Sequence, residues 1–332
     1  MEISIESSSE TKQAAMKCAV CSSSSTVLWS ERSWFLPGYA RNFHYRVCLS
    51  CESIYCDPLP SSDEIASYYA DHFDYGWFEE HLALKKFQAA CRWKSVVTLL
   101  KKHHMDRGRV LDVGCGHGLF LSCAQRSGWE AVGVDYPSIA TTYARQQLGL
   151  DVVEGDLCSV VAGARIGAGS FNLVVSWHCL EHVMDPMSFL RGMSAALAPG
   201  GKLLVAVPNV NSQGMRLCRE NWVWCQQPYV HLTHFSDKAL MLLARDCGLK
   251  VLDIWTHDTW DANPAFDIHA APIITHLAKI IRPISVTAAF LAEEVGRVAC
   301  YTANRIGHQF FHNGKGAPHG SELLFLAERC SE

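Results

Sequence analysis

The chain has 332 residues, of which 49% are hydrophobic and 19% are charged, and its formal net charge is -4. This length is enough for a large core, and the slight acidity argues against a nucleic-acid partner bound through a broad basic face. The first residues are polar and lack the apolar core of a signal peptide, and no apolar run is long enough to span a bilayer. Fifteen cysteines without such a signal indicate a reducing compartment. We therefore expect a cytoplasmic protein.

Two Cys-x-x-Cys pairs lie near the start of the chain, Cys18 with Cys21 and Cys48 with Cys51. Two such pairs can place four thiolates tetrahedrally around zinc, and four cysteine ligands leave no coordination position open. We therefore expect a zinc ribbon with a structural role over residues 17–60. Four ordinary buried cysteines and a redox pair are the alternatives.

From residue 109 onward, predicted strands and helices alternate. Strands are expected over 109–113, 130–134, 150–154, 171–176, 202–207, 249–255 and 322–328, and helices over 117–127, 138–147, 186–197 and 237–247. This rhythm predicts a parallel sheet with helices on both faces. The expected units are a disordered tail (1–16), the zinc ribbon (17–60), a helical lead-in (61–107), a Rossmann-like domain (108–257), a helical cap inserted over 258–318, and a last strand (319–332).

The run RVLDVGCGHG, residues 109–118, joins a buried strand to a helix through a glycine-rich turn. Asp135 ends the next strand about twenty residues on, where a carboxylate reaches the ribose hydroxyls of a nucleoside cofactor. The spacing is G-x-G-x-G rather than the G-x-G-x-x-G of dinucleotide sites, and Asp112 precedes it. A carboxylate there suits the ammonium group of a methionine moiety better than a pyrophosphate. The pattern favours S-adenosylmethionine (SAM) over NAD.

Further motifs follow in order: Gly155-Asp156-Leu157, the segment VSWHCLEHV at 175–183, and LAPGG at 197–201. Together with the glycine turn they resemble class I SAM-dependent methyltransferases over about residues 60–330. The resemblance implies a doubly wound, Rossmann-like α/β fold with a seven-stranded sheet of order 3-2-1-4-5-7-6, whose last strand is antiparallel. It also implies that Asp135 binds ribose, that Asp156 accepts a hydrogen bond from the adenine amino group, and that Leu157 flanks the ring. The expected cofactor-binding residues are Asp112, Gly114, Cys115, Gly116, Gly118, Asp135, Tyr136, Asp156, Leu157 and Trp177.

The four-cysteine module, followed by Asp57-Pro58-Leu59-Pro60 and a Tyr-Tyr pair, is similar to the front end of small-molecule and sugar methyltransferases. That subgroup includes C-methyltransferases with a longer C-terminal domain, which we do not expect in this sequence. We therefore expect methyl transfer to a hydroxyl of a small molecule or sugar, with C- or N-methylation as alternatives. An NAD-dependent oxidoreductase and a non-catalytic binding module are the competing hypotheses, and a homodimer is left open.

Three histidines are candidates for the base that removes the hydroxyl proton: His178, His182 and His231. Each could instead have a structural role. Glu181 with His182 could hold Mg²⁺, and the string H-x-x-E-H also matches an inverted zinc-protease motif, which would need a long helix rather than the end of a strand. The residues expected to line an acceptor pocket, if 210–230 folds over the site, are Asn221, Trp222, Trp224 and Tyr229.

Overall fold

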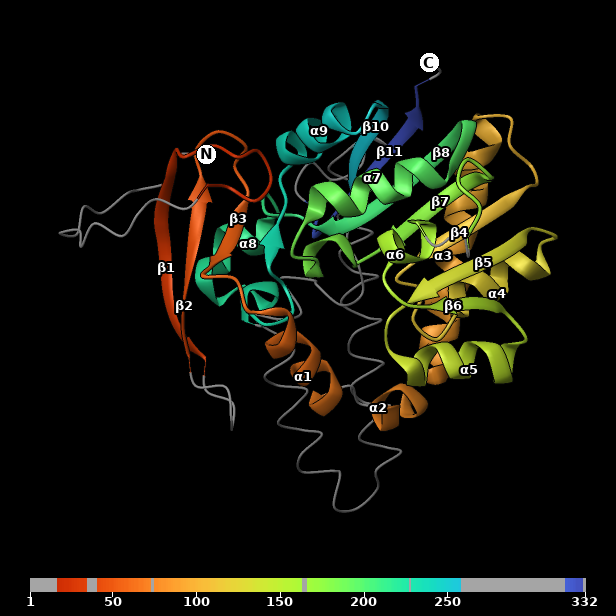
Figure 1. Ribbon diagram of the computed structural model, residues 1–332, viewed down its shortest axis with the longest axis horizontal. Helices are drawn as coiled ribbons and strands as arrows, with labels where there is room; N and C mark the ends of the chain where they lie inside the picture. Colours follow the sequence, from red (N-terminus) through yellow and green to blue (C-terminus); the bar gives the residue numbers. More distant parts are fainter. Residues whose placement is uncertain are drawn as a thin grey trace, which may run out of the picture.

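The computed structural model describes residues 17–34, 41–72, 75–162, 166–226, 228–257 and 320–330. They form two sheets, one of four strands and one of seven (Figure 1). The tail expected over 1–16 and the helical cap expected over 258–318 lie outside the described residues. Among the described residues, no helix has both the length and the apolar character that crossing a bilayer requires.

The larger sheet has the order β10-β11-β8-β7-β4-β5-β6. Its strands are β4 (Arg109–Val113), β5 (Glu130–Asp135), β6 (Asp151–Glu154), β7 (Phe171–Trp177), β8 (Leu197–Pro208), β10 (Leu249–His257) and β11 (Glu322–Arg329). Strand β11 runs antiparallel to both β10 and β8, whereas β6, β5, β4, β7 and β8 pair in parallel. The expected order 3-2-1-4-5-7-6 and the antiparallel last strand are confirmed.

Helices cover both faces of this sheet, as the alternating pattern predicted (Figure 1). One face packs against α7 and α9 through residues such as Leu190, Met193 and Leu243. The other packs against α3, α4 and α5 through residues such as Trp93 and Leu121. The helix bounds are α3 (Leu82–Lys102), α4 (Leu119–Arg126), α5 (Ser138–Leu148), α6 (Leu157–Ala162), α7 (Pro186–Ala196) and α9 (Asp237–Asp246). The central strands are therefore buried on both sides, which explains their nearly continuous apolar sequence.

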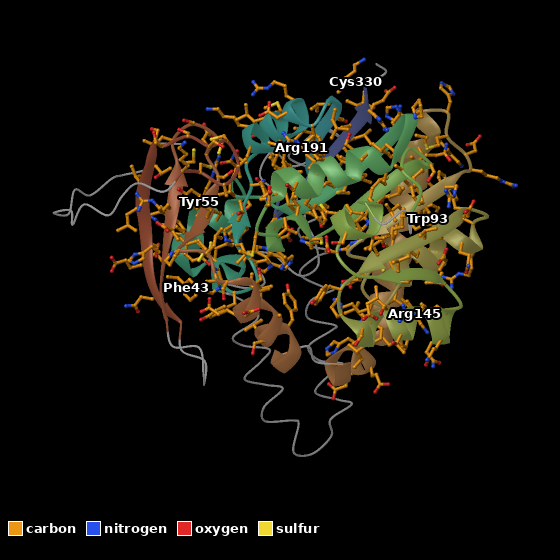
Figure 2. All side chains as sticks on the ribbon, in the orientation of Figure 1. Phe43, Tyr55, Trp93, Arg145, Arg191 and Cys330 are labelled. Atoms are coloured by element: carbon orange, nitrogen blue, oxygen red, sulfur yellow. The ribbon has the colours of Figure 1, made fainter. Side chains whose placement is uncertain are left out.

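The smaller sheet has the order β1-β2-β3-β9. Strands β1 (Thr26–Trp34), β2 (Arg41–Cys48) and β3 (Ile54–Asp57) come from the expected zinc ribbon, and we call the described residues from 17 to 57 the cysteine module. The fourth strand, β9 (Thr233–His234), comes from the chain that follows β8. In Figure 2, Phe43 and Tyr55 of the module lie at the opposite end of the molecule from Trp93 and Arg145.

Short elements connect the two sheets: α1 (Ser62–His72), α2 (Tyr75–Glu80), α8 (Gln213–Cys218) and the 3-10 turns η1 (Leu180–His182), η2 (Arg219–Asn221) and η3 (Val223–Gln226). The Ser61-x-x-Glu64 pattern behaves as a capping box, because Glu64 N donates to Ser61 Oγ and Ser61 N donates to a Glu64 carboxylate oxygen. Ser236 caps α9 by accepting a hydrogen bond from Ala239 N at 3.0 Å.

Several elements differ from the prediction. The residues after β6 form the short helix α6 where a loop was expected, since Asp156 accepts a hydrogen bond from Ser159 N and starts a helical turn. Strand β8 begins at Leu197, five residues before the predicted start of the strand at Lys202. Leu197 already pairs with Phe171 of β7. Strands β3 and β9 were not predicted, because both are too short to show an alternating pattern.

Candidate active site

The glycine turn follows β4 and lies against the turn that follows β7. Gly114 has a φ of +77°, and a Cβ atom there would come within 2.7 Å of Cys179 Sγ. Glycine is therefore needed for both the backbone conformation and the close approach. Gly116 has a φ of +53°, and a Cβ atom there would meet nothing within 4 Å. The turn is thus closed on the side of Cys179 and open at Gly116, where a ligand can approach the backbone.

Asp112 stands at the end of β4 and is 2% exposed. Within the described part of the chain, its Oδ1 atom is buried without a hydrogen-bond partner. Burial raises the pKa of Asp112 to about 8, and the nearby charge of Asp135 adds to this shift while Arg92 opposes it. A buried, unpaired carboxylate is costly, and a cationic group such as the ammonium of SAM would satisfy it.

Asp135, at the end of β5, connects the two turns of the expected cofactor site. One of its carboxylate oxygens accepts a hydrogen bond from Gly116 N at 2.5 Å, and the other accepts from Tyr136 N at 2.7 Å. Burial raises the pKa of Asp135, and these two backbone donors act in the opposite direction. The Tyr136 side chain is 68% exposed. Asp135 therefore holds the glycine turn in place and retains lone pairs for ribose hydroxyls.

The residues expected at the adenine end differ in exposure. Asp156 is exposed, and its hydrogen bonds with Ser159 lower its pKa. Leu157 is 3% exposed and packs in the core beside Gly192 of α7. In this structure, Asp156 is accessible to an adenine amino group, whereas the Leu157 side chain faces α7.

Trp177, the last residue of β7, lies between two other side chains. Its ring is 5.6 Å from that of Phe120 and 5.4 Å from the guanidinium of Arg92, which lies over its face. Trp177 Nε1 is buried and has no hydrogen-bond partner among the described residues. Arg92, on α3, is the cation that acts on Asp112. It was not predicted, and it brings a positive charge to the methionine end of the expected cofactor site.

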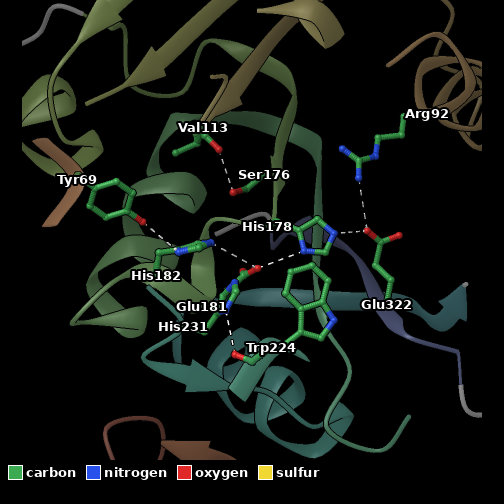
Figure 3. A network of polar contacts seen from close by, with 10 residues as sticks. All are labelled: Tyr69, Arg92, Val113, Ser176, His178, Glu181, His182, Trp224, His231 and Glu322. Carbon is green, nitrogen blue, oxygen red and sulfur yellow. Dashed lines mark hydrogen bonds and ion pairs between the residues drawn. The ribbon is translucent and has the colours of Figure 1, made fainter. Parts of the chain in front are cut away.

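His178 is held between two carboxylates (Figure 3). Its Nδ1 atom is 3.2 Å from Glu181 Oε1, and its Nε2 atom is 2.5 Å from Glu322 Oε1 on β11. Burial disfavours the charged ring, but the hydrogen bonds and charges of Glu181 and Glu322 outweigh it and raise the pKa of His178 to about 9. His178 is therefore protonated at neutral pH, and both of its nitrogens are occupied as donors.

His182 lies on the opposite side of Glu181. Its Nδ1 atom is 3.2 Å from the Tyr69 hydroxyl, and its Nε2 atom is 3.8 Å from Glu181 Oε1. Burial lowers the pKa of His182. A neutral ring places its proton best on Nε2, toward the carboxylate, and accepts the Tyr69 proton on Nδ1. Nδ1 then has a hydrogen-bond partner, whereas Nε2 lies 3.8 Å from the carboxylate, beyond hydrogen-bond distance.

His231 is 4% exposed and comes from the connection between β8 and β9. Its Nδ1 atom is 3.0 Å from the main-chain oxygen of Trp224, and its ring is 4.8 Å from that of His182. Burial, together with the neighbouring histidines, lowers the pKa of His231 well below its ordinary value. Because a carbonyl only accepts, Nδ1 carries the proton and Nε2 holds a lone pair. Among the described residues, that Nε2 atom has no hydrogen-bond partner.

Glu181, His182 and His231 lie close enough to be considered as metal ligands, since one ligand atom from each falls within 4.8 Å of the others. Two imidazoles and one carboxylate are a poor match for Mg²⁺, which prefers oxygen ligands. Glu181 Oε1 contacts His178, whereas Glu181 Oε2 is buried without a hydrogen-bond partner among the described residues. It is therefore the pair of imidazole ligands, and not the occupancy of Glu181, that argues against magnesium. The H-x-x-E-H string lies on a strand end and a 3-10 turn, which lacks the long helix of a zinc protease.

The four cysteines of the module converge. Cys18 Sγ is 3.6 Å from Cys51 Sγ, Cys21 Sγ is 3.5 Å from Cys48 Sγ, and all four sulfurs lie within 4.8 Å of one another. These distances exclude disulfides, in which the sulfurs are about 2.05 Å apart. Tetrahedral zinc with Zn–S bonds of about 2.3 Å places its sulfurs about 3.8 Å apart. The four thiols therefore fit zinc.

The aromatic residues expected around the acceptor fall into two groups. Trp224 stacks on His178, with a ring distance of 5.5 Å, and meets the His231 ring edge-on. Trp222 and Tyr229 are buried in the core that joins the cysteine module to this segment. The Asn221 side chain lies outside the part of the chain that the structure describes. Trp224 thus lies at the histidine network, while Trp222 and Tyr229 hold the segment in place.

A family model for a methyltransferase domain matches residues 84–254, about half of the chain. The chain belongs to the methyltransferase domain family. This is the family that the glycine turn and the strand order predicted. The competing alternatives, an oxidoreductase and a non-catalytic module, have no support from this assignment.

Curated relatives agree with the assignment over part of their length. The methyltransferase is 36% identical over 115 residues to a ubiquinone biosynthesis O-methyltransferase of Caulobacter sp., a match that covers 33% of this chain and 45% of the relative. It is 34% identical over 155 residues to the enzyme of the same name from Cereibacter sphaeroides, covering 44% and 61%. The chain thus spans about half the length of these relatives.

Solved structures that the chain resembles include a SAM-dependent methyltransferase of Thermotoga maritima, with 17% identity, a TM-score of 0.46, and coverage of 80% of this chain and 98% of that one. A second, from Archaeoglobus fulgidus, has 16% identity, a TM-score of 0.46, and coverage of 77% and 100%. The fold assignment rests on the strand order described above rather than on these scores.

Proposed function

We propose that this enzyme transfers the methyl group of SAM to a hydroxyl of a small molecule or sugar, with His231 as the base. The observation that carries the proposal is the state of His231: a buried, neutral ring whose Nδ1 proton is fixed on Trp224, leaving Nε2 free to take a proton. Two relatives that match part of the chain are named as O-methyltransferases, which supports an oxygen acceptor.

Bound SAM would supply a methyl group that is already activated, so the protein mainly has to orient the two reactants and remove a proton. On the donor side, Asp112 would pair with the ammonium group, and Arg92 is placed for the carboxylate of the same moiety. Asp135 and Asp156 would bind the ribose hydroxyls and the adenine amino group. Of these residues, Asp135 is hydrogen-bonded to Gly116 N at the open side of the glycine turn.

On the acceptor side, His231 would take the hydroxyl proton as the oxygen attacks. The protonated His178 and the carboxylate of Glu181 form an ion pair next to it. Glu181 can stabilise the positive charge that His231 gains. His182 is hydrogen-bonded to Tyr69 and lies near Glu181, so we assign it an orienting role. The turn after β7, which carries Glu181, lies against Gly114 through Cys179. The same turn is bonded to the residue after His231, because Leu232 N donates to the main-chain oxygen of Glu181.

We also propose that the four cysteines hold one structural zinc ion. All four ligand positions are cysteine, so the ion would contribute folding stability and no open position for chemistry. We propose no role for metal at Glu181, His182 and His231.

Two experiments test the proposed function. Calorimetry of the purified protein should detect binding of S-adenosylhomocysteine, the demethylated product of SAM. Labelled SAM should then transfer its methyl group to hydroxyl compounds in a panel of sugars, phenols and amines. Transfer to amines alone would contradict the hydroxyl acceptor, and absence of cofactor binding would contradict the whole proposal.

A further inference from the structure

The cysteine module is connected to the acceptor side by backbone hydrogen bonds. Strand β3 pairs with β9, with Ile54 opposite His234 and Tyr55 opposite Thr233. The ladder continues one step further, because Cys56 N donates to Leu232 O at 2.9 Å. The chain just after His231 is therefore part of the module's own sheet.

Leu232 is bonded on both sides. While its carbonyl accepts from Cys56, its N–H donates to the main-chain oxygen of Glu181 at 2.8 Å. One residue thus bridges the module and the turn that carries Glu181, and His231 precedes that residue directly. Movement of β3 would therefore shift both groups together.

The stretch from His231 to Ser236 is also anchored at a cysteine of the four-cysteine cluster. Ser236 Oγ donates to the main-chain oxygen of Cys51 at 2.6 Å while it accepts from Ala239 N. Glu52 and Lys238 add an exposed ion pair at 3.5 Å, which contributes little. The cysteine cluster, the start of α9 and β9 are consequently one hydrogen-bonded unit.

A second connection reaches the hydrogen bond that fixes the tautomer of His231. Tyr45, on β2, is fully buried, and its hydroxyl donates to the main-chain oxygen of Cys225 at 3.1 Å. The preceding carbonyl, that of Trp224, accepts the Nδ1 proton of His231. Tyr45 thus restrains the peptide next to the one that orients the ring.

From these contacts we infer that the cysteine module is the platform that fixes His231, and that Tyr45 is a positioning residue for methyl transfer. The inference rests on the proposed function, in which His231 is the base. The hydrogen bonds from the module described above all reach the segment 225–236, so we expect its influence on the acceptor side.

The test compares two variants that each remove one buried phenol hydroxyl from the module. In Tyr45→Phe, the bond to Cys225 is lost. In Tyr55→Phe, the lost hydroxyl pairs with Thr26 inside the module.

Tyr45→Phe should lower kcat about three- to tenfold. It should also move the acidic limb of the pH profile to higher pH, because a looser, better hydrated His231 ring is more easily protonated. The dissociation constant for S-adenosylhomocysteine should stay within about twofold.

Tyr55→Phe should match the wild type in all three measurements. Equal losses in the two variants, or a Tyr45→Phe enzyme with wild-type kcat and pH profile, would overturn the inference. If His231→Asn itself remains fully active, the proposed function fails instead, so the two failures can be told apart.

A second measurement does not depend on turnover. Treating the full-length protein with a zinc chelator should speed hydrogen exchange in peptides covering 228–236, while the affinity for S-adenosylhomocysteine is unchanged. If exchange in 228–236 stays slow, or if cofactor affinity is lost to the same extent as turnover, the module is not a platform specific to the acceptor side.

Discussion

The Nδ1 atom of His231 lies 3.0 Å from the main-chain oxygen of Trp224, and this contact fixes which ring nitrogen carries the proton. A backbone carbonyl cannot donate, so the lone pair must lie on Nε2. Burial keeps the pKa of His231 well below its ordinary value. The protein therefore holds a neutral imidazole in a single orientation, which is the state that the proposed base requires.

Replacing His231 with Asn should remove this base. We expect kcat to fall about 100- to 10,000-fold, while the dissociation constant for S-adenosylhomocysteine stays within about twofold. His104→Asn is the matched control, since this exposed residue has a φ of +56°, which Asn tolerates well. A metal role for the same cluster would instead appear as activity that depends on an added divalent cation.

Asp112→Asn should weaken cofactor binding, because the buried carboxylate has no partner until the ammonium group arrives. We expect a loss of about 10- to 100-fold in affinity. With a pKa of about 8, Asp112 is largely protonated at pH 7, and pairing with a cation should ionise it. Calorimetry in buffers of different ionisation enthalpy should show up to about one proton released per bound cofactor. Identical proton release from Asp112→Asn would contradict the assignment.

The ion pair between His178 and Glu322 should make stability depend on pH. The folded pKa of His178, about 9, lies above its ordinary value of 6.5, so the stabilisation is full below about pH 6.5 and is lost as the pH rises through about 9. Glu322→Gln should lower the free energy of unfolding by about 1–3 kcal/mol at pH 6. At pH 9.5 the effect should be much smaller, because the charge of His178 is then largely gone, although the substitution still removes the 4.0 Å contact of Glu322 with Arg92. Urea unfolding at several pH values measures this difference.

Glu328→Gln, on the same strand, provides the control for that comparison. Its partly exposed carboxylate pairs with Lys202 at 2.9 Å and involves no histidine of the site. Its effect on the free energy of unfolding should be small and nearly constant from pH 6 to 9.5. A Glu322→Gln effect with the same flat profile would show that His178 is not charged in the native state.

Zinc binding is tested by comparing a cysteine substitution inside the four-cysteine cluster with one outside it. Elemental analysis should find about one zinc per wild-type chain and much less in Cys18→Ser. Cys56→Ser, at a buried cysteine of β3 outside the cluster, should retain the metal. Zinc well below one per chain in wild-type protein purified without chelator would rule out the site.

The donor side of the site could be predicted from the sequence because its parts are local. Strand β4 was predicted over the residues that form it, since a run of three apolar residues and one aspartate after Arg109 ends abruptly at glycines. Asp112, Gly114 and Asp135 lie at the ends of parallel strands, where the fold brings them to one edge of the sheet. Local sequence patterns, together with the rule that the carboxyl ends of parallel strands meet at one edge of the sheet, are sufficient to predict the donor side.

The acceptor side depends on contacts between distant parts of the chain, which leave no local pattern. Glu322 reaches His178 from the last strand, and Tyr69 reaches His182 from a short helix before the sheet. Sequence reasoning named the three histidines, but it could not rank them, because their hydrogen-bond partners decide which nitrogen is free. Those partners are visible only in the folded chain.

Strand β9 has a consequence for how the chain folds as it is synthesised. The hydroxyl of Ser236 and the carbonyl of Cys51 are joined across 185 residues, and the sheet of the cysteine module lacks its fourth strand until that later stretch has left the ribosome. Until then, β3 would be an unpaired edge strand of the sheet that carries the cysteine cluster, and such an edge is prone to pairing with the wrong segment. Metal capture during translation could hold the first three strands together over this interval, and the order in which the two ends of the protein mature would then depend on the supply of the ion.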